Sequence, residues 1–114
     1  MSDSTTDRPR VKAVEHLESL GLSSYAARTF VALVALDTGT AKSVSDTVDV
    51  PRTRVYDAVE ELGEWGLVSV EESTPKQFRS VSNETAADVF EREYMNRISA
   101  LRRALAAVES PERD

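Results

Sequence analysis

The strongest constraint on the fold is one stretch of sequence, VPRTRVYDAVEELGEWGLV, which runs from Val50 to Val68. Pro51 suits the first turn of a helix, because proline has no N–H to lose there and its φ is already helical. Val55, Val59 and Leu62 follow at helical spacing, so one side of this helix is apolar and must be covered by the domain. The other side of its first two turns is basic and polar. The stretch therefore predicts an anchored helix whose N-terminal end faces outward.

The chain has 114 residues, no cysteine and one histidine. This length fits a single domain with one appended element. Without cysteine there is no disulfide framework and no thiolate metal site, and a single histidine cannot build a histidine site. We therefore expect no cofactor and no metal. No apolar run approaches the ~20 residues needed to cross a membrane, and the polar N-terminus has no signal pattern. The sequence predicts a cytoplasmic protein with no membrane partner.

The formal net charge of -6 counts against nucleic acid, because a nucleic-acid binder is expected to be basic. The basic residues are almost all arginine, while carboxylates are spread along the whole chain. This bias resembles halophilic archaeal proteins, whose acidic surfaces are general. At molar salt the Debye length falls to ~3 Å, so contacts between close charges matter more than the net charge. The composition therefore leaves DNA open as a partner.

Two helices are predicted before the central stretch. Apolar residues recur every third position from Val11 to Leu20 and predict a short helix that ends at Gly21, after a disordered tail over residues 1–9. Ser23 is expected to cap a second helix over about residues 24–36. We expect the apolar side chains of this helix to be core residues: Ala26, Ala27, Phe30, Leu33 and Val34.

Thr40 is expected to cap a third, short helix over residues 41–48. Only two residues separate it from Pro51, so two helices follow each other in the arrangement of a helix-turn-helix. The second of them, over residues 51–65, is the helix expected to read DNA.

Two short β-strands are predicted after the reading helix. β-branched residues follow Gly66, a turn is expected at residues 73–75, and a second strand at residues 76–81. Three helices followed by a β-hairpin are the order of a winged helix-turn-helix, with the wing over residues 67–81. The predicted fold is mainly α with a small β-hairpin, and its DNA-binding domain spans residues 10–82.

Ser82 is expected to cap a long last helix over residues 83–109, followed by a tail over residues 110–114. Its apolar residues are spaced by threes and fours, which is typical of a coiled-coil seam. We expect this seam to pair two copies in a homodimer, since twofold dimers are the commonest assemblies. Folding of the helix back onto the domain is the alternative. The seam residues are Phe90, Tyr94, Ile98, Leu101, Leu105 and Val108.

Three blocks of the sequence carry a resemblance to a known family: LGLSSYAARTFVALVAL, VPRTRVYDAVEELGEWGLV and TPKQFRSVS. In this order they resemble the N-terminal winged helix-turn-helix domain of the TrmB-like archaeal transcriptional regulators, over about residues 20–82. The resemblance implies a domain that binds promoter DNA as a dimer. Many relatives continue into a sugar-sensing domain, and this chain stops after one helix, so the resemblance does not imply a sugar ligand and no small-molecule effector domain is evident. Ala26 replaces the family's frequent glutamate after the serine cap, which weakens a capping box.

On the DNA hypothesis, the first two turns of the reading helix meet the major groove of double-stranded DNA. Arginine pairs bidentately with guanine or clamps a phosphate, and which arginine reads a base is left open. The later turns present Glu60 and Glu64, which phosphates repel unless cations are taken up. We therefore expect a salt slope near zero or positive, instead of about -0.9 per neutralised phosphate.

The expected DNA contacts lie on three elements. Those of the third helix use free N–H groups, and those of the wing touch the backbone or the minor groove. The residues are Arg52, Thr53, Arg54 and Tyr56 in the reading helix, Thr40, Lys42 and Ser43 in the third helix, and Lys76, Gln77 and Arg79 in the wing.

Two other classes of protein were weighed against a DNA-binding regulator. An enzyme is not expected, because the sequence has no glycine-rich phosphate loop and no nucleophile beside a base. Neighbouring carboxylates such as Glu60 and Glu61 are interpreted as solvated surface. The alternative function is a winged-helix module for protein–protein contacts without DNA reading. Arg52 and Arg54 count against it, because such a module does not need them at the start of an exposed helix.

Overall fold

The computed structural model describes residues 3–109, and the fold is mainly α with a small antiparallel sheet and a long C-terminal helix. The chain divides into two compact units, Met1–Ser82 and Asn83–Asp114. In chain order the elements are α1 (Asp3–Ser19), α2 (Ser24–Leu36), β1 (Thr38–Gly39), α3 (Ala41–Thr47), α4 (Arg52–Trp65), β2 (Val68–Glu71), β3 (Gln77–Ser80) and α5 (Asn83–Glu109). Among the described residues, no helix is both long and apolar enough to cross a membrane.

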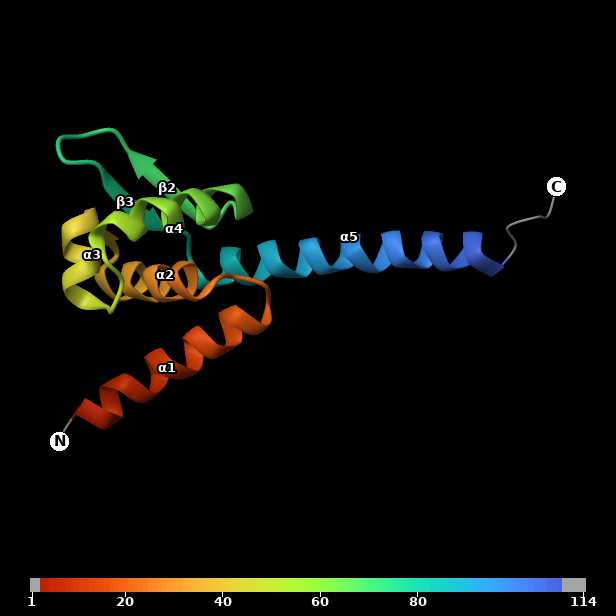
Figure 1. Ribbon diagram of the computed structural model, residues 1–114, viewed down its shortest axis with the longest axis horizontal. Helices are drawn as coiled ribbons and strands as arrows, with labels where there is room; N and C mark the ends of the chain where they lie inside the picture. The colour runs from red at the N-terminus through yellow and green to blue at the C-terminus, as the bar shows by residue number, and fades with distance from the viewer. Residues whose placement is uncertain (1–2, 110–114) are drawn as a thin grey trace. The chain divides into compact units, whose positions relative to one another are not determined.

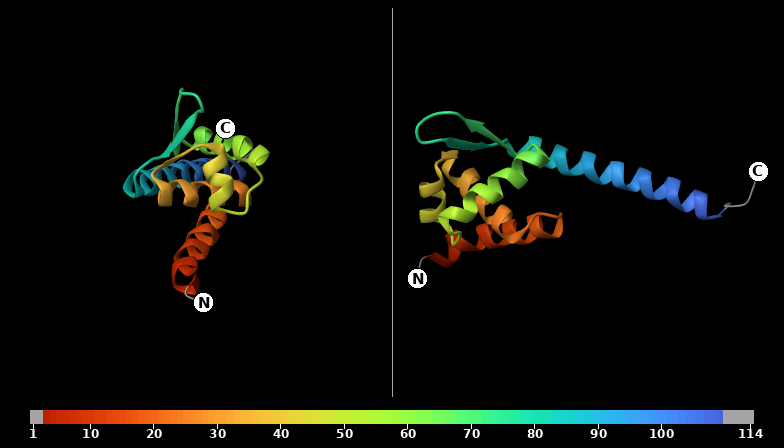
Figure 2. Two further views of the ribbon diagram at one scale, coloured as in Figure 1. Left: turned by 90° about the vertical axis from the view of Figure 1, so that its left-hand side faces the viewer. Right: turned by 45° about the horizontal axis from the view of Figure 1, so that its top comes forward.

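Helix α2 lies at the centre of the first unit, between α1 on one side and the β2–β3 hairpin on the other (Figures 1 and 2). Its residues from 26 to 33 are buried almost without interruption. A hydrophobic cluster joins α2 to the helix-turn-helix and to the sheet, so the apolar sides of these elements share one core. Its members are Ala32, Leu33, Ala41, Val44, Val50, Val55, Val59 and Phe78.

The central stretch forms the predicted helix α4. Pro51 is its N-cap with φ -59°, one residue before the helix begins, and Gly66 closes it in the left-handed region with φ 83°. Val55 and Leu62 have no exposed surface, and Val59 is also buried. The predicted apolar stripe is confirmed, and it fixes which side of α4 faces the solvent.

Two of the predicted caps, Ser23 and Thr40, are present. The Ser23 hydroxyl accepts a hydrogen bond of 3.2 Å from the N–H of Ala26. At the start of α3, Thr40 and Ser43 form a capping box, in which each side chain accepts a bond from the other residue's backbone N–H. These caps supply partners for N–H groups that a helix leaves unpaired in its first turn.

The sheet has three strands in the order β1-β3-β2, all antiparallel, instead of the predicted two. β1 pairs Thr38 with Arg79 and Gly39 with Phe78. Two residues are too few to produce an alternating pattern in the sequence, so the strand was not predicted. It ties the end of α2 to the wing.

Two expectations for the helices differ from the structure. α1 begins at Asp3 and contains Pro9, where a disordered tail was expected over residues 1–9. Once a helix has formed, adding a residue at its end does not repeat the cost of nucleation, which favours this extension. Val34 is 43% exposed and is not a core residue, because the last turn of α2 runs past the elements that cover the earlier turns.

Candidate nucleic-acid interface

The start of α4 presents the four residues that the sequence assigned to DNA. Arg52, Thr53 and Arg54 are exposed, and so is Tyr56 at 52%. They lie in the first two turns, away from the buried stripe that begins with Val55. The structure therefore brings them together on one exposed helix end, where a reading helix contacts base edges.

Tyr56 connects this helix end to the wing. Its ring meets the ring of Phe78 edge to face, with 6.4 Å between centroids and an interplanar angle of 83°. Phe78 is buried in β3 and contacts one edge of the Tyr56 ring, while Tyr56 remains about half exposed to solvent. Aromatic pairs of this geometry contribute about 0.5–1.5 kcal/mol beyond burial, so the contact couples the positions of α4 and β3.

The wing residues are placed by the alternation of β3. Phe78 points into the core, and its neighbour Arg79 is exposed, because successive side chains of a strand face opposite sides. Lys76 is exposed just before the strand, and Gln77, its first residue, is half-buried. Two cations and one amide thus lie along the hairpin.

The predicted role of the α3 N-terminus needs a correction. The N–H of Thr40 donates to Ser43 Oγ at 2.8 Å, and the N–H of Ser43 donates to Thr40 Oγ1 at 3.1 Å. These two N–H groups are therefore used by the capping box and are not free for phosphate. Lys42 is exposed between them and keeps a side chain that can reach a phosphate.

Four cations of this surface already have a carboxylate partner in the same chain. All the carboxylates and all four cations are more than half exposed. The pairs are Lys42–Asp46 at 2.8 Å, Arg54–Asp57 at 3.5 Å, Lys76–Glu72 at 3.9 Å and Arg79–Asp37 at 3.4 Å. Three of them are visible in the sequence as spacings of three or four, but the Arg79–Asp37 pair exists only because β1 lies beside β3.

Glu61 has a role that the sequence analysis missed. Its carboxylate accepts bonds from the Ser23 N–H at 2.9 Å and from the Ser23 hydroxyl at 2.7 Å. The interpretation of Glu61 as solvated surface is wrong, because it joins the C-terminal half of α4 to the start of α2. No local signal could have found this bond, since the partners are 38 residues apart.

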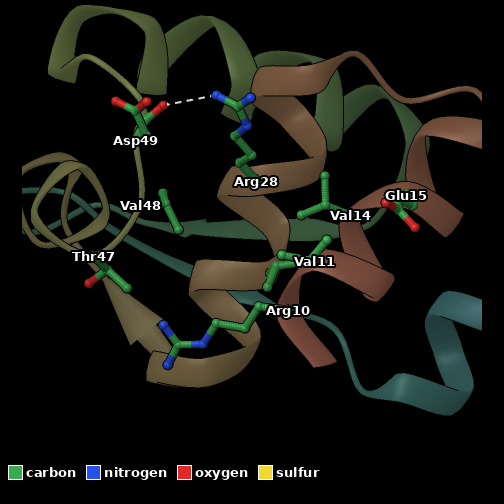
Figure 3. A pocket seen from close by; sticks show the side chains of 9 residues that line it. Arg10, Val11, Val14, Glu15, Arg28, Thr47, Val48 and Asp49 are labelled. Atoms are coloured by element: carbon green, nitrogen blue, oxygen red, sulfur yellow. Dashed lines mark hydrogen bonds between the residues drawn. The ribbon is translucent and has the colours of Figure 1, made fainter. Parts of the chain in front are cut away.

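A groove of about 580 Å³ lies on another part of the first unit (Figure 3). Valines of α1, α2 and the α3–α4 connection line it, and none of the expected DNA contacts does. Beside it, Arg28 of α2 donates to the backbone carbonyl of Asp49 at 3.1 Å. This bond holds the connection that leads into α4, so Arg28 helps to position the helix.

The seam residues of α5 divide into two groups. Phe90 is 6% exposed in the single chain and has little surface left for a second copy. Tyr94 is half-buried, and the Arg97 guanidinium lies 5.0 Å from its ring centroid. The remaining seam residues are each more than half exposed: Ile98, Leu101, Leu105 and Val108.

Among residues 3–109, no group of three or more His, Asp or Glu side chains is placed to hold a metal ion.

Residues 17–84 match the sequence profile of the family described as "Sugar-specific transcriptional regulator TrmB". The chain is 25% identical over 91 residues to TrmBL1 of Pyrococcus furiosus, described as an HTH-type sugar sensing transcriptional regulator. That alignment covers 80% of this chain and 27% of TrmBL1. The chain thus spans about a quarter of the length of this relative.

Solved structures with a similar fold include TrmBL2, described as an archaeal chromatin protein with a novel mode of DNA binding. The TM-score is 0.83 at 24% identity, over 90% of this chain and 41% of that one. A possible transcriptional regulator from Methanosarcina mazei Go1 has a TM-score of 0.63 at 12% identity, over 84% of this chain and 86% of that one. At these identities the similarity supports the fold.

Proposed function

The chain belongs to the TrmB family, and we propose that it is a sequence-specific transcriptional regulator that binds double-stranded DNA as a homodimer. In this proposal α4 lies in the major groove and the wing touches the DNA backbone or the minor groove. One observation carries it: the first two turns of α4 expose Arg52, Thr53, Arg54 and Tyr56, while the opposite side of the helix is locked into the core. A major groove admits one such helix, and N-terminal residues of a reading helix meet base edges.

The wing and α3 supply the remaining contacts in this proposal. Lys42, Lys76, Gln77 and Arg79 are placed to touch phosphates, which fix the position of a protein on the duplex without reading sequence. Thr40 and Ser43 contribute by holding the start of α3 in its capped form.

A mobility-shift experiment in high salt, with DNA from the gene's own upstream region, tests the proposal. We expect the wild type to shift this DNA. The Arg52→Ala/Arg54→Ala double variant should lose about 1–3 kcal/mol or more of the free energy of specific binding. Arg8→Ala/Lys12→Ala removes the same charge from the exposed surface of α1 and should bind like the wild type. If no complex forms with the wild type, the alternative of a protein–protein interaction module replaces this proposal.

The homodimer rests on the exposed part of the α5 seam. Leu101 and Leu105 are 55% and 54% exposed, and a second copy would remove such surface from water. In sedimentation velocity the wild type should be a dimer, and Leu101→Asp/Leu105→Asp should be a monomer. The matched variant Ala100→Asp/Ala107→Asp carries the same charges off the seam and should remain a dimer. A monomeric wild type would contradict this part of the proposal.

Three further properties belong to the same proposal. The protein acts on DNA in the cytoplasm and is not an enzyme; the family's description as a transcriptional regulator supports this part of the proposal. It needs no cofactor. Sugar sensing is part of the description of TrmBL1 and is not part of this proposal, because the alignment covers only 27% of that protein.

A further inference from the structure

The cations of the proposed DNA surface are of two kinds. Four of them, Lys42, Arg54, Lys76 and Arg79, each lie within 4.0 Å of a carboxylate of the same chain. Arg52 is the exception: among the described residues, no carboxylate lies within ion-pair distance of it. When DNA approaches, the four paired cations are therefore already bound to a carboxylate, whereas Arg52 is not.

Within the first unit, the ion pairs of the described residues are confined to this surface. The first unit has four other cations, Arg8, Arg10, Lys12 and Arg28, and within the described part of the chain none of them is in an ion pair. Pairing is thus concentrated where phosphates would bind.

A phosphate competes with a carboxylate for each of the four paired cations, and the closest contact with the cation displaces that carboxylate. Exposed ion pairs are worth little, so each displacement reduces affinity by roughly 5-fold at most. Afterwards the carboxylate stays close to the phosphate, and its charge is balanced by cations from the solution. Fewer ions are then released overall than the ~0.9 per neutralised phosphate of an ordinary binder.

Arg52 does not have this competition. It is the first residue of α4 and lies four residues before Tyr56, hence on the same side of the helix as the ring that contacts the wing. Its guanidinium has all its donors available for a bidentate contact with guanine O6 and N7. Arg54, two residues further along the helix, lies 3.5 Å from the Asp57 carboxylate.

We propose that Arg52 supplies the sequence-specific contact of α4, and that Asp37, Asp46, Asp57 and Glu72 compete with DNA phosphates for the other four cations. The proposal rests on the proposed DNA-binding function and names the specificity residue within it. The carboxylates lower the affinity for every duplex and flatten its dependence on salt. In this proposal the flat dependence of affinity on salt is caused by Asp37, Asp46, Asp57 and Glu72, and not by Glu60 and Glu64.

The test uses two labelled duplexes, one selected from random-sequence DNA by the wild-type chain and one scrambled version of it. Fluorescence anisotropy is measured from about 0.1 to about 1 M KCl, which covers Debye lengths of about 10 to 3 Å. Arg52→Ala should lose roughly 10-fold or more on the selected duplex and little on the scrambled one. Arg52→Lys keeps the charge but not the planar fork, and should lose discrimination in the same way. Arg54→Ala should weaken both duplexes by a similar, smaller factor.

The carboxylates are tested by the variant that combines Asp37→Asn, Asp46→Asn, Asp57→Asn and Glu72→Gln. Its log–log salt slope should become more negative by roughly 2 to 4, and both duplexes should bind more tightly at low salt. The control Glu18→Gln removes a carboxylate from the exposed surface of α1, away from these four pairs, and should leave the slope at its wild-type value.

Two results would overturn the inference. One is an Arg52→Ala variant that weakens both duplexes equally, and the other is an amide variant whose slope equals that of the wild type. A wild type that selects no sequence and binds neither duplex would instead remove the proposed function itself.

Discussion

The carboxylate of Glu61 in α4 accepts two hydrogen bonds from Ser23, from its N–H at 2.9 Å and from its hydroxyl at 2.7 Å. In a capping box the third residue of the helix makes the bond to the N-cap N–H, but here that residue is Ala26, which cannot. A residue from another helix replaces the missing glutamate. Its negative charge also lies at the N-terminal end of α2, where the helix dipole favours it.

We therefore expect Glu61→Ala to lower the free energy of unfolding by about 1–2 kcal/mol, because α2 loses the partner of its cap and the link to α4. Glu60→Ala is the matched control, since Glu60 is exposed on the same helix and should change stability by less than about 0.5 kcal/mol. Urea denaturation monitored by circular dichroism measures both. Equal stability of the two variants would show that the Ser23 bonds contribute nothing.

Gly39 is expected to reject even a methyl group. A Cβ at this position would lie 2.9 Å from Ser43 Oγ and 3.3 Å from side-chain atoms of Leu33 and Leu36. Ser43 Oγ belongs to the capping box of α3, so Gly39→Ala should cost about 1–3 kcal/mol. In contrast, Gly63 has open space around it in the last turn of α4, and Gly63→Ala should stabilise by about 0.5–1 kcal/mol. Thermal unfolding of the pair gives opposite shifts in Tm if this is correct.

Thr29 is fully buried in α2, and its hydroxyl has no hydrogen-bond partner among the described residues. A buried hydroxyl without a partner costs about 1–3 kcal/mol, so Thr29→Val, which keeps the shape, should raise stability by about 1 kcal/mol. Thr47 is the control: its hydroxyl donates to the Ser43 carbonyl at 2.7 Å, so Thr47→Val should lower stability. Calorimetry of both variants decides it, and a destabilised Thr29→Val would contradict the prediction.

The contact between Tyr56 and Phe78 predicts that the reading helix and the wing are energetically coupled. A double-mutant cycle with Tyr56→Ala and Phe78→Leu should give a coupling energy of about 0.5–1.5 kcal/mol. Tyr56→Phe retains the ring contact and should unfold at the wild-type urea concentration. A coupling energy of zero would mean that α4 and β3 are positioned independently.

Much of the fold was predictable because its signals are local. The stripe through Val55 and Leu62 and the caps at Ser23 and Thr40 depend only on the spacing of residues within one helix. β1 was missed because its two residues gain strand structure only through pairing with β3. Val34 was misplaced for a similar reason, since helical spacing gives the side of a helix that is apolar but not where its cover ends.

The sequence alone determined the order of helices and strands, the exposed basic start of α4 and the expected contacts Arg52, Thr53, Arg54 and Tyr56, because period and capping act over a few residues. Only the tertiary structure decided which polar groups already have a hydrogen-bond or ion-pair partner within the chain. Thr40 and Ser43 bond each other, Glu61 serves another helix, and Asp37 reaches Arg79 across the sheet. Hydrogen bonds and ion pairs form wherever folding brings partners within about 3–4 Å, and sequence distance does not report that separation.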